Sequence, residues 1–192
     1  MQGLKRAAEI VLLSVFAAVA YGIVHDQITA RICIEYFTVA HPKIIESKSP
    51  TLLGLAWGVV ATWWAGLGVG IVLALSSRLG RWPKLTWRDN VRPVALLLCA
   101  MTLYACFWGW LFPQIAIPLT QDSFWGGRIP ASKYHAFLTC SGAHNASYES
   151  GFFGGLSISA WAIWRRYRAA ASTRDRQQAE PNGSSINGDQ RT

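Results

Sequence analysis

The residues of this sequence that could carry chemistry are histidines and carboxylates near the ends of its apolar segments. His25 is followed directly by Asp26, and His144 precedes Glu149 by about one helical turn. Imidazole nitrogens and carboxylate oxygens are ligands that zinc and other transition metals accept. His25, Asp26, His144 and Glu149 are therefore the candidate metal ligands.

The spacing of these residues matches no established metal motif. The sequence has no HExxH, no two histidines on one helical turn and no CxxC. We therefore expect the histidines, which also include His41 and His135, to form polar caps and interfacial hydrogen bonds. No metal or other cofactor is expected.

The cysteines divide into two pairs. Cys99 and Cys106 lie in an apolar run and are expected to be packing residues. Cys33 and Cys140 lie outside the apolar runs, where an oxidising compartment permits a disulfide. A bridge between them would close a loop of roughly a hundred residues and join an outer segment to the start of the last helix.

The elements that position these residues belong in a membrane. Of the 192 residues, 52% are hydrophobic and only 15% are charged, and ten are Trp. Four apolar segments, at about 7–24, 52–75, 94–112 and 145–164, approach or exceed the ~20 residues that a helix needs to span a bilayer. The sequence predicts an all-α integral membrane protein, a bundle of four transmembrane helices occupying residues 1–167.

Details within these segments refine the prediction. The third helix is expected to start near Asp89 or Asn90 with Pro93 in its first turn, and to end at Pro113 and Pro118. The fourth segment is the weakest because it contains Glu149, and an ionisable group inside a span is a functional hypothesis.

The distribution of positive charge predicts the orientation. The net charge is +8, and all cations except Arg31, Lys43, Lys48, Arg128 and Lys133 fall on one side of the predicted bundle. Positive charge is retained in the cytoplasm, so both termini should be cytoplasmic and the protein should lie in the inner (plasma) membrane. Because the cations flank spans and form no basic face of their own, nucleic-acid binding is not expected.

The first apolar segment has a second interpretation. It starts with MQGLKR and ends with small residues at Ala18 and Ala20, as a cleaved signal peptide would. Glu9 interrupts its positive region, so we favour an uncleaved span. Under both interpretations the segment from His25 to Pro50 lies outside.

The outer segment from Gln27 to Tyr36 alternates polar or small residues with apolar ones. This period of two predicts a short extended segment on the outer face, with its isoleucines turned inward. Arg31 and Glu35 would then be neighbours on its polar face.

Small residues recur at every fourth position of the second and fourth segments. Such stripes allow helix backbones to approach closely in a bilayer. We expect close packing without a wide pore at Gly54, Gly58, Gly66 and Gly70 of the second segment, and at Gly151 and Gly155 of the fourth. After Tyr167 the composition becomes polar, and residues 168–192 are expected to form a disordered cytoplasmic tail.

Two resemblances bear on function. Four spans with outer cysteines are similar to the disulfide-generating quinone reductases of bacterial inner membranes, but those enzymes carry a CxxC pair that this sequence lacks. The stretch VHDQITARICIEYFTVAHP, residues 24–42, resembles one in small multi-span bacterial membrane proteins of unknown function. The second resemblance implies a bacterial inner membrane and no particular activity.

The leading hypothesis is a non-enzymatic accessory or binding subunit, whose partners are the lipid bilayer and another membrane protein. One alternative is a small transporter or metal-handling protein that uses His25, Asp26, His144 and Glu149. The other is a membrane thiol oxidoreductase, which would work through Cys33 and Cys140.

Overall fold

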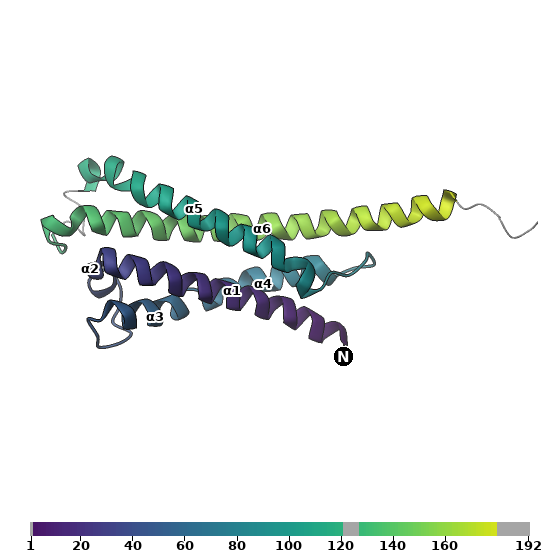
Figure 1. The fold of residues 1–192 in the computed structure, drawn as a ribbon, viewed down its shortest axis with the longest axis horizontal. Coiled ribbons are helices and arrows are strands. Elements are labelled where there is room, and N and C mark those ends of the chain that lie inside the picture. The colour runs from purple at the N-terminus through teal and green to yellow at the C-terminus, as the bar shows by residue number, and fades with distance from the viewer. Residues whose placement is uncertain (1, 121–126, 180–192) are drawn as a thin grey trace, which may run out of the picture.

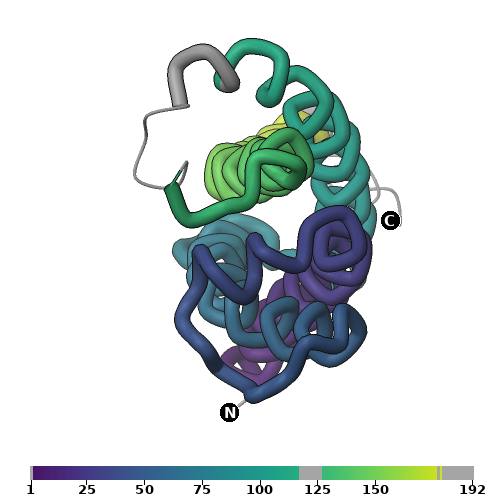
Figure 2. The backbone as a smooth tube through the Cα atoms, turned by 90° about the vertical axis from the view of Figure 1, so that its left-hand side faces the viewer, coloured from purple at the N-terminus to yellow at the C-terminus, as the bar shows by residue number. Residues whose placement is uncertain are grey.

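The apolar runs of the sequence form long helices that lie side by side (Figure 1). The computed structural model describes residues 2–120 and 127–179, and the regular elements in these ranges are all helices. They are α1 (Gln2–Ile32), α2 (Ile34–Thr38), α3 (Pro50–Val60), α4 (Trp63–Arg78), α5 (Trp87–Thr120), the 3-10 helix η1 (Ala131–Lys133) and α6 (Tyr134–Ala179). Helix α1 packs on α3 and α4, and α5 packs on α6. Viewed end-on, these two groups lie against each other (Figure 2), with α6 also in contact with α4.

Within the described residues, three segments are long and apolar enough to cross a membrane, judged by length and composition. They are Gln2–Ile32, Pro50–Arg78 and Trp87–Ala116, which correspond to α1, to α3 with α4, and to most of α5. The prediction of a helical membrane protein is confirmed at this level. Helix α6 contains the fourth predicted segment, 145–164, but does not meet the same standard of length and composition.

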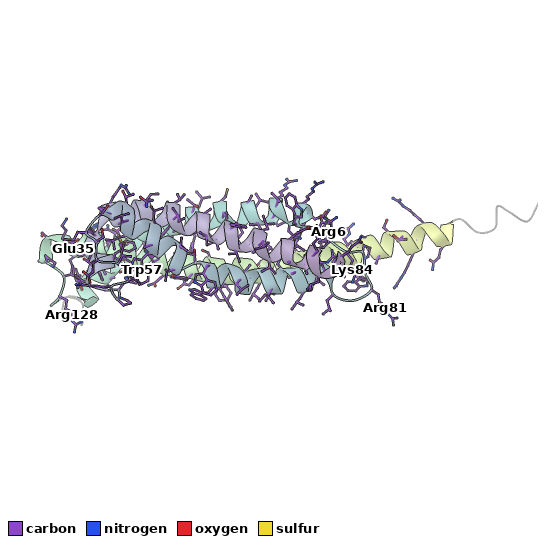
Figure 3. The ribbon with its side chains drawn as sticks, turned by 90° about the horizontal axis from the view of Figure 1, so that it is seen from below. Arg6, Glu35, Trp57, Arg81, Lys84 and Arg128 are labelled. Carbon is purple, nitrogen blue, oxygen red and sulfur yellow. The ribbon has the colours of Figure 1, made fainter. Side chains whose placement is uncertain are left out.

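The two ends of the bundle are built from different connections. Helix α2 and the chain that follows it lie at one end, called here the α2 end (Figure 1). The connection between α4 and α5, residues 79–86, lies at the other, called here the loop end. Figure 3 shows Glu35, Trp57 and Arg128 at the α2 end, and Arg6, Arg81 and Lys84 at the loop end.

Each end contains a buried apolar cluster that joins helices distant in sequence. The cluster at the α2 end comprises Ala30, Cys33, Tyr36, Phe37, Leu53, Trp57, Ile129, Phe137 and Cys140. The cluster toward the loop end comprises Ile10, Leu73, Ala74, Leu85, Val94 and Ala162. The bundle is therefore packed at both ends and not only along its helix stripes.

The second predicted span, 52–75, consists of two helices. Helix α3 ends at Val60 and α4 begins at Trp63. Thr62 lies at the break, and its Oγ1 donates a hydrogen bond to the carbonyl oxygen of Gly58 at 2.5 Å. A threonine that bonds back to the preceding turn competes with the backbone ladder and often bends a helix. The segment still has the length of one span.

The prediction that the third helix ends at Pro113 is wrong, since α5 continues to Thr120. A proline removes one backbone hydrogen bond and crowds the preceding turn, but Pro113 is fully buried and Ala116 is nearly so. Packing of this turn against the bundle therefore outweighs the local preference. At the start of α5, Asp89 accepts hydrogen bonds from the Thr86 backbone N–H at 2.9 Å and its hydroxyl at 2.8 Å, which caps the helix.

The predicted extended segment at Gln27–Tyr36 is also wrong. Residues 27–32 continue α1, and α2 follows after a single extended residue, Cys33. Side-chain bonds of helical spacing support the last turns: Thr29 Oγ1 donates to the His25 carbonyl at 3.1 Å, and Arg31 Nη1 to the Gln27 carbonyl at 2.6 Å. A helix already formed by the apolar run extends at little cost, so the local alternation does not decide the structure.

The small residues of α3 and α4 lie against the backbone of α1. A Cβ added at Gly58 would lie 2.5 Å from the Ile23 Cα, and one at Gly54 would lie 2.9 Å from the Asp26 carbonyl oxygen. Gly66 and Gly70 approach the Ser14 region of α1 in the same way. No side chain fits at Gly58 unless the two backbones separate.

The glycines of α6 face different neighbours. A Cβ at Gly155 would lie 2.8 Å from a methyl group of Val69 in α4, and one at Gly151 would lie 3.3 Å from the Met101 Cε in α5. The stripe of α3 and α4 thus packs on the backbone of α1, whereas the glycines of α6 contact side chains of α4 and α5.

Part of the predicted disordered tail is helical. Residues 168–179 extend α6 past the bundle, as Figure 1 shows, and most of their side chains are exposed. This stretch contains Ala, Arg and Gln, which favour helix, and it continues a helix that is already nucleated. Residues 180–192 of the predicted tail lie outside the described residues.

Candidate metal site

Helices α1 and α6 bring three of the four candidate ligands together. His25 and Asp26 come from the last part of α1, and His144 comes from α6. One ligand atom from each residue lies within 4.8 Å of the others. His144 Nε2 is 3.0 Å from Asp26 Oδ1, and His25 Nε2 is 3.4 Å from His144 Nδ1. The group is enclosed, because Asp26 is only 4% exposed and His144 only 8%.

Hydrogen bonding fixes the tautomer of His144. Its Nδ1 lies 2.8 Å from the carbonyl oxygen of Cys140, which only accepts, so Nδ1 carries a hydrogen. Its Nε2 faces a carboxylate oxygen of Asp26, and this contact needs one further proton, on the imidazole or on the carboxyl. A metal cation between the two groups would take the place of that proton.

Packing between α1 and α6 holds the three side chains in place. Tyr21 is one turn before His25 on α1, and its hydroxyl lies 2.8 Å from the Ser147 Oγ of α6. The Tyr21 ring also stacks on His25, with ring centroids 5.7 Å apart. Because the two helices are joined next to the site, the ligand separations are set by the fold.

Aromatic rings from α2 cover the group. The Tyr36 ring lies 4.5 Å from the His144 ring, and Phe37 lies 5.8 Å from it. His41 packs on Tyr36 and donates Nδ1–H to the Tyr36 carbonyl oxygen at 2.8 Å. Burial lowers the pKa of His41 below its ordinary value of 6.5, so its imidazole is neutral at pH 7. These rings enclose the group on the side of α2.

The fourth candidate, Glu149, lies outside the group. It is exposed on α6. Five residues at 100° each place it about 140° around the helix from His144, so the two side chains face different directions. His135 is exposed as well and lies near Gln114, with 3.4 Å between His135 Nε2 and Gln114 Nε2.

Tyr36 and His41 were not among the residues predicted to form this site. Tyr36 ends the segment predicted as extended and His41 follows it, and only the turn after Cys33 returns this part of the chain over α1. Their types were a usable signal, because a buried aromatic cluster with histidine often surrounds a polar site, but their position depended on the correct local structure.

The cysteine pair lies in the same end of the bundle. Cys33 and Cys140 are both buried and both free thiols. Cys140 Sγ donates to the Thr29 carbonyl at 3.4 Å, and Cys33 Sγ contacts Glu35 Oε2 at 3.4 Å. Burial raises the pKa of both thiols, which keeps them protonated and poorly nucleophilic. The disulfide between them stays a prediction.

No known protein family, curated protein or solved structure matches this chain. Its function must therefore be inferred from the chemistry of the His25, Asp26 and His144 group, called here the His–Asp site.

Proposed function

We propose that this chain is an integral membrane protein that binds a divalent transition metal ion, with zinc as the reference case, through the His–Asp site. The observation that carries the proposal is the convergence of three ligand atoms within 4.8 Å from two helices. Buried ionisable groups are costly in a membrane protein and mark functional positions by default.

The separations suit a single ion. Two ligand atoms bound to one zinc ion at ~2.0–2.2 Å lie roughly 3.3–3.5 Å apart in tetrahedral geometry. The observed separation of 3.0 Å between His144 Nε2 and Asp26 Oδ1 is close to that value, and one ligand atom of His25 lies within 4.8 Å of both side chains. Small side-chain rotations are therefore sufficient, and the helices need not move.

The surroundings of His144 favour coordination through Nε2. Metal-bound imidazoles commonly donate their other N–H to a backbone carbonyl, which orients the ring and raises its basicity. The Nδ1 contact with the Cys140 carbonyl has this form. The ion would thus bind between His144 Nε2 and Asp26, with His25 completing the protein ligands.

Three protein ligands leave one position of a tetrahedral site for water or another exchangeable ligand. Structural zinc sites usually have four protein ligands, whereas sites that exchange ligands keep a position open. The proposal is therefore metal handling, meaning reversible capture of an ion at one membrane surface. The role as an accessory subunit stays a prediction. Apolar side chains on the bundle surface do not by themselves indicate a protein partner, because contact with lipid accounts for them.

The proposed topology places the α2 end outside. Helix α6 packs along α5 and α4, and its segment 145–164 acts as the fourth span. The cations of the loop end and of the part of α6 beyond the bundle then lie in the cytoplasm, in agreement with the retention of positive charge. Both termini are cytoplasmic in this arrangement, and the His–Asp site faces outward in the inner membrane.

A reporter tests the orientation. An alkaline phosphatase domain inserted near Ser47 should be active, because it would be exported, and one fused after Thr192 should be inactive. Activity of the fusion at Thr192 with silence at Ser47 would invert the topology and place the His–Asp site on the cytoplasmic side.

Metal content tests the proposed function. The full-length protein, purified in detergent and equilibrated with zinc, should retain about one zinc ion per chain after removal of free metal. Elemental analysis measures this directly. A folded protein that retains no stoichiometric transition metal would contradict the proposal, because the fold already brings His25, Asp26 and His144 together.

A further inference from the structure

A cavity at the loop end is lined by positively charged side chains from separate parts of the chain. Its volume is about 590 Å³, and its lining residues are Gln2, Gly3, Arg6, Arg78, Lys84, Thr86, Trp87 and Arg88. The four cations come from α1, from the last turn of α4, from the connecting loop and from the first turn of α5. No Asp or Glu lines the cavity.

The charges of this basic cavity are largely uncompensated. Arg6 pairs with Glu9 at 3.2 Å, in a contact that is exposed to solvent. Within residues 2–120 and 127–179, neither Arg78, Lys84 nor Arg88 forms an ion pair. Like charges held together repel one another, so an anion that enters the cavity relieves this repulsion and gains attraction from each cation.

The cavity walls are fixed by a buried arginine of α6. Arg166 is only 2% exposed, and its guanidinium donates hydrogen bonds to four backbone carbonyls of the loop end: Ser76 at 2.5 Å, Leu79 at 2.7 Å, Pro83 at 2.8 Å and Trp82 at 3.3 Å. These contacts hold the chain on both sides of Arg78 and directly before Lys84 in one conformation. Arg78 and Lys84 are therefore positioned before any ligand arrives.

The cationic groups keep donors available for a ligand. Lys84 Nζ donates to the carbonyls of Arg78 and Gly80, which leaves one of its three hydrogens free. Arg78 uses Nη1 for the Leu85 carbonyl at 2.9 Å and retains other N–H groups. A phosphate group, which offers several acceptor oxygens, matches this set of donors.

The cavity lies where the apolar helices leave the membrane. Arg6 and Lys84 occupy the same end of the bundle, as Figure 3 shows. Trp87 lines the cavity and carries the Arg88 guanidinium 5.5 Å from its ring centroid, an arrangement typical of the headgroup level. Beside the lining residues, Leu4 and Leu79 leave 79% and 70% of their surface exposed, which provides apolar contact for acyl chains.

We infer that this basic cavity binds the phosphate headgroup of an anionic phospholipid. The inference is independent of the metal proposal but rests on the proposed topology, which places the loop end at the cytoplasmic surface of the membrane. Basic pockets between membrane helices on the cytoplasmic side are suited to such headgroups. The exposed leucines favour a lipid over a free phosphate ion, because a free ion would make no use of them.

Native mass spectrometry of the delipidated full-length protein tests the site. With phosphatidylglycerol added, we expect one lipid to remain bound per chain, and with phosphatidylcholine at the same concentration none. The Arg88→Gln variant should bind phosphatidylglycerol about fivefold more weakly, the effect of one cation near a lipid surface. Arg81→Gln removes the same charge from an exposed residue of the adjoining 79–86 connection, outside the cavity, and should bind normally.

Two results would overturn the inference. Equal weakening by Arg88→Gln and Arg81→Gln would mean that general surface charge and not the cavity attracts the lipid. Displacement of phosphatidylglycerol by inorganic phosphate at equal concentration would mean that the site takes a free anion. Circular dichroism of both variants confirms that the helices are intact in each comparison.

Discussion

Replacing His144 with Ala is expected to weaken zinc binding by a factor on the order of 100 or more. Even the outer partners of metal ligands are worth 10–100-fold in affinity, and His144 is the residue that contacts both Asp26 and His25. Titration of the detergent-purified protein with zinc against a competing chelator measures the loss. His25→Ala should produce a similar loss, and it tests the site with less risk to the fold because His25 is less buried than His144.

The matched control is His135→Ala. His135 is also a histidine of the α2 end, but it is exposed and lies outside the His–Asp site. Its replacement should leave zinc affinity unchanged. If His135→Ala and His144→Ala reduce affinity equally, the ion is held by surface histidines and the proposed ligands are wrong.

Replacing Gly58 with Leu should separate α3 from α1 and remove metal binding at the same time. A Cβ at this position would lie 2.5 Å from the Ile23 Cα and 2.6 Å from its nitrogen, and backbone atoms cannot move aside as a flexible side chain does. Overpacking of this kind costs about 3 kcal/mol, which corresponds to roughly 6–12 °C in Tm for a chain of this length. Because Ile23 precedes His25 and Asp26 on α1, the ligands would be displaced as well.

Gly68→Leu is the control for this prediction. Gly68 belongs to the same membrane segment, but nothing lies within 4 Å of a Cβ added there. The substitution should change Tm little and leave zinc binding intact. Equal thermal stability of the Gly58→Leu and Gly68→Leu proteins in detergent would show that the close approach of α1 and α3 does not stabilise the bundle.

The membrane character of this fold was predictable because long apolar runs have few structural solutions. The boundaries were less so. Pro113 ends a helix by local preference, yet its burial in the bundle keeps α5 intact. The alternation from Gln27 to Tyr36 suggested a strand, but an existing helix extends across it. In both places, contacts with other parts of the chain outweigh the local pattern.

The candidate site was predictable in part for a topological reason. His25, Asp26 and His144 all follow or precede predicted spans at the same membrane surface, so the span pattern alone brings them to one end. Glu149 lies inside the fourth predicted span near the same surface, but on α6 its side chain points in a different direction from that of His144. The expectation of polar caps without metal rested on spacing motifs, which detect ligands near in sequence and do not register a group of side chains assembled from two distant helices; that expectation stays a prediction.

The glycine stripes show a related limit. The sequence indicates which face of a helix permits close approach, but not which helix occupies it. Gly54 and Gly58 meet α1, whereas Gly155 meets α4. Which helix packs on a glycine face depends on whether the surface of the neighbouring helix fits it, and this is decided only when the helices assemble.

X-ray absorption at the zinc edge of the purified, zinc-loaded protein tests the central claim most directly, because it reports the atoms bound to the ion. Coordination by His25, Asp26 and His144 predicts a shell of nitrogen and oxygen at ~2.0–2.2 Å, with imidazole scattering and no sulfur. A sulfur shell at about 2.3 Å would contradict it, since the ion would then be held by cysteines such as Cys33 or Cys140 and not by the His–Asp site.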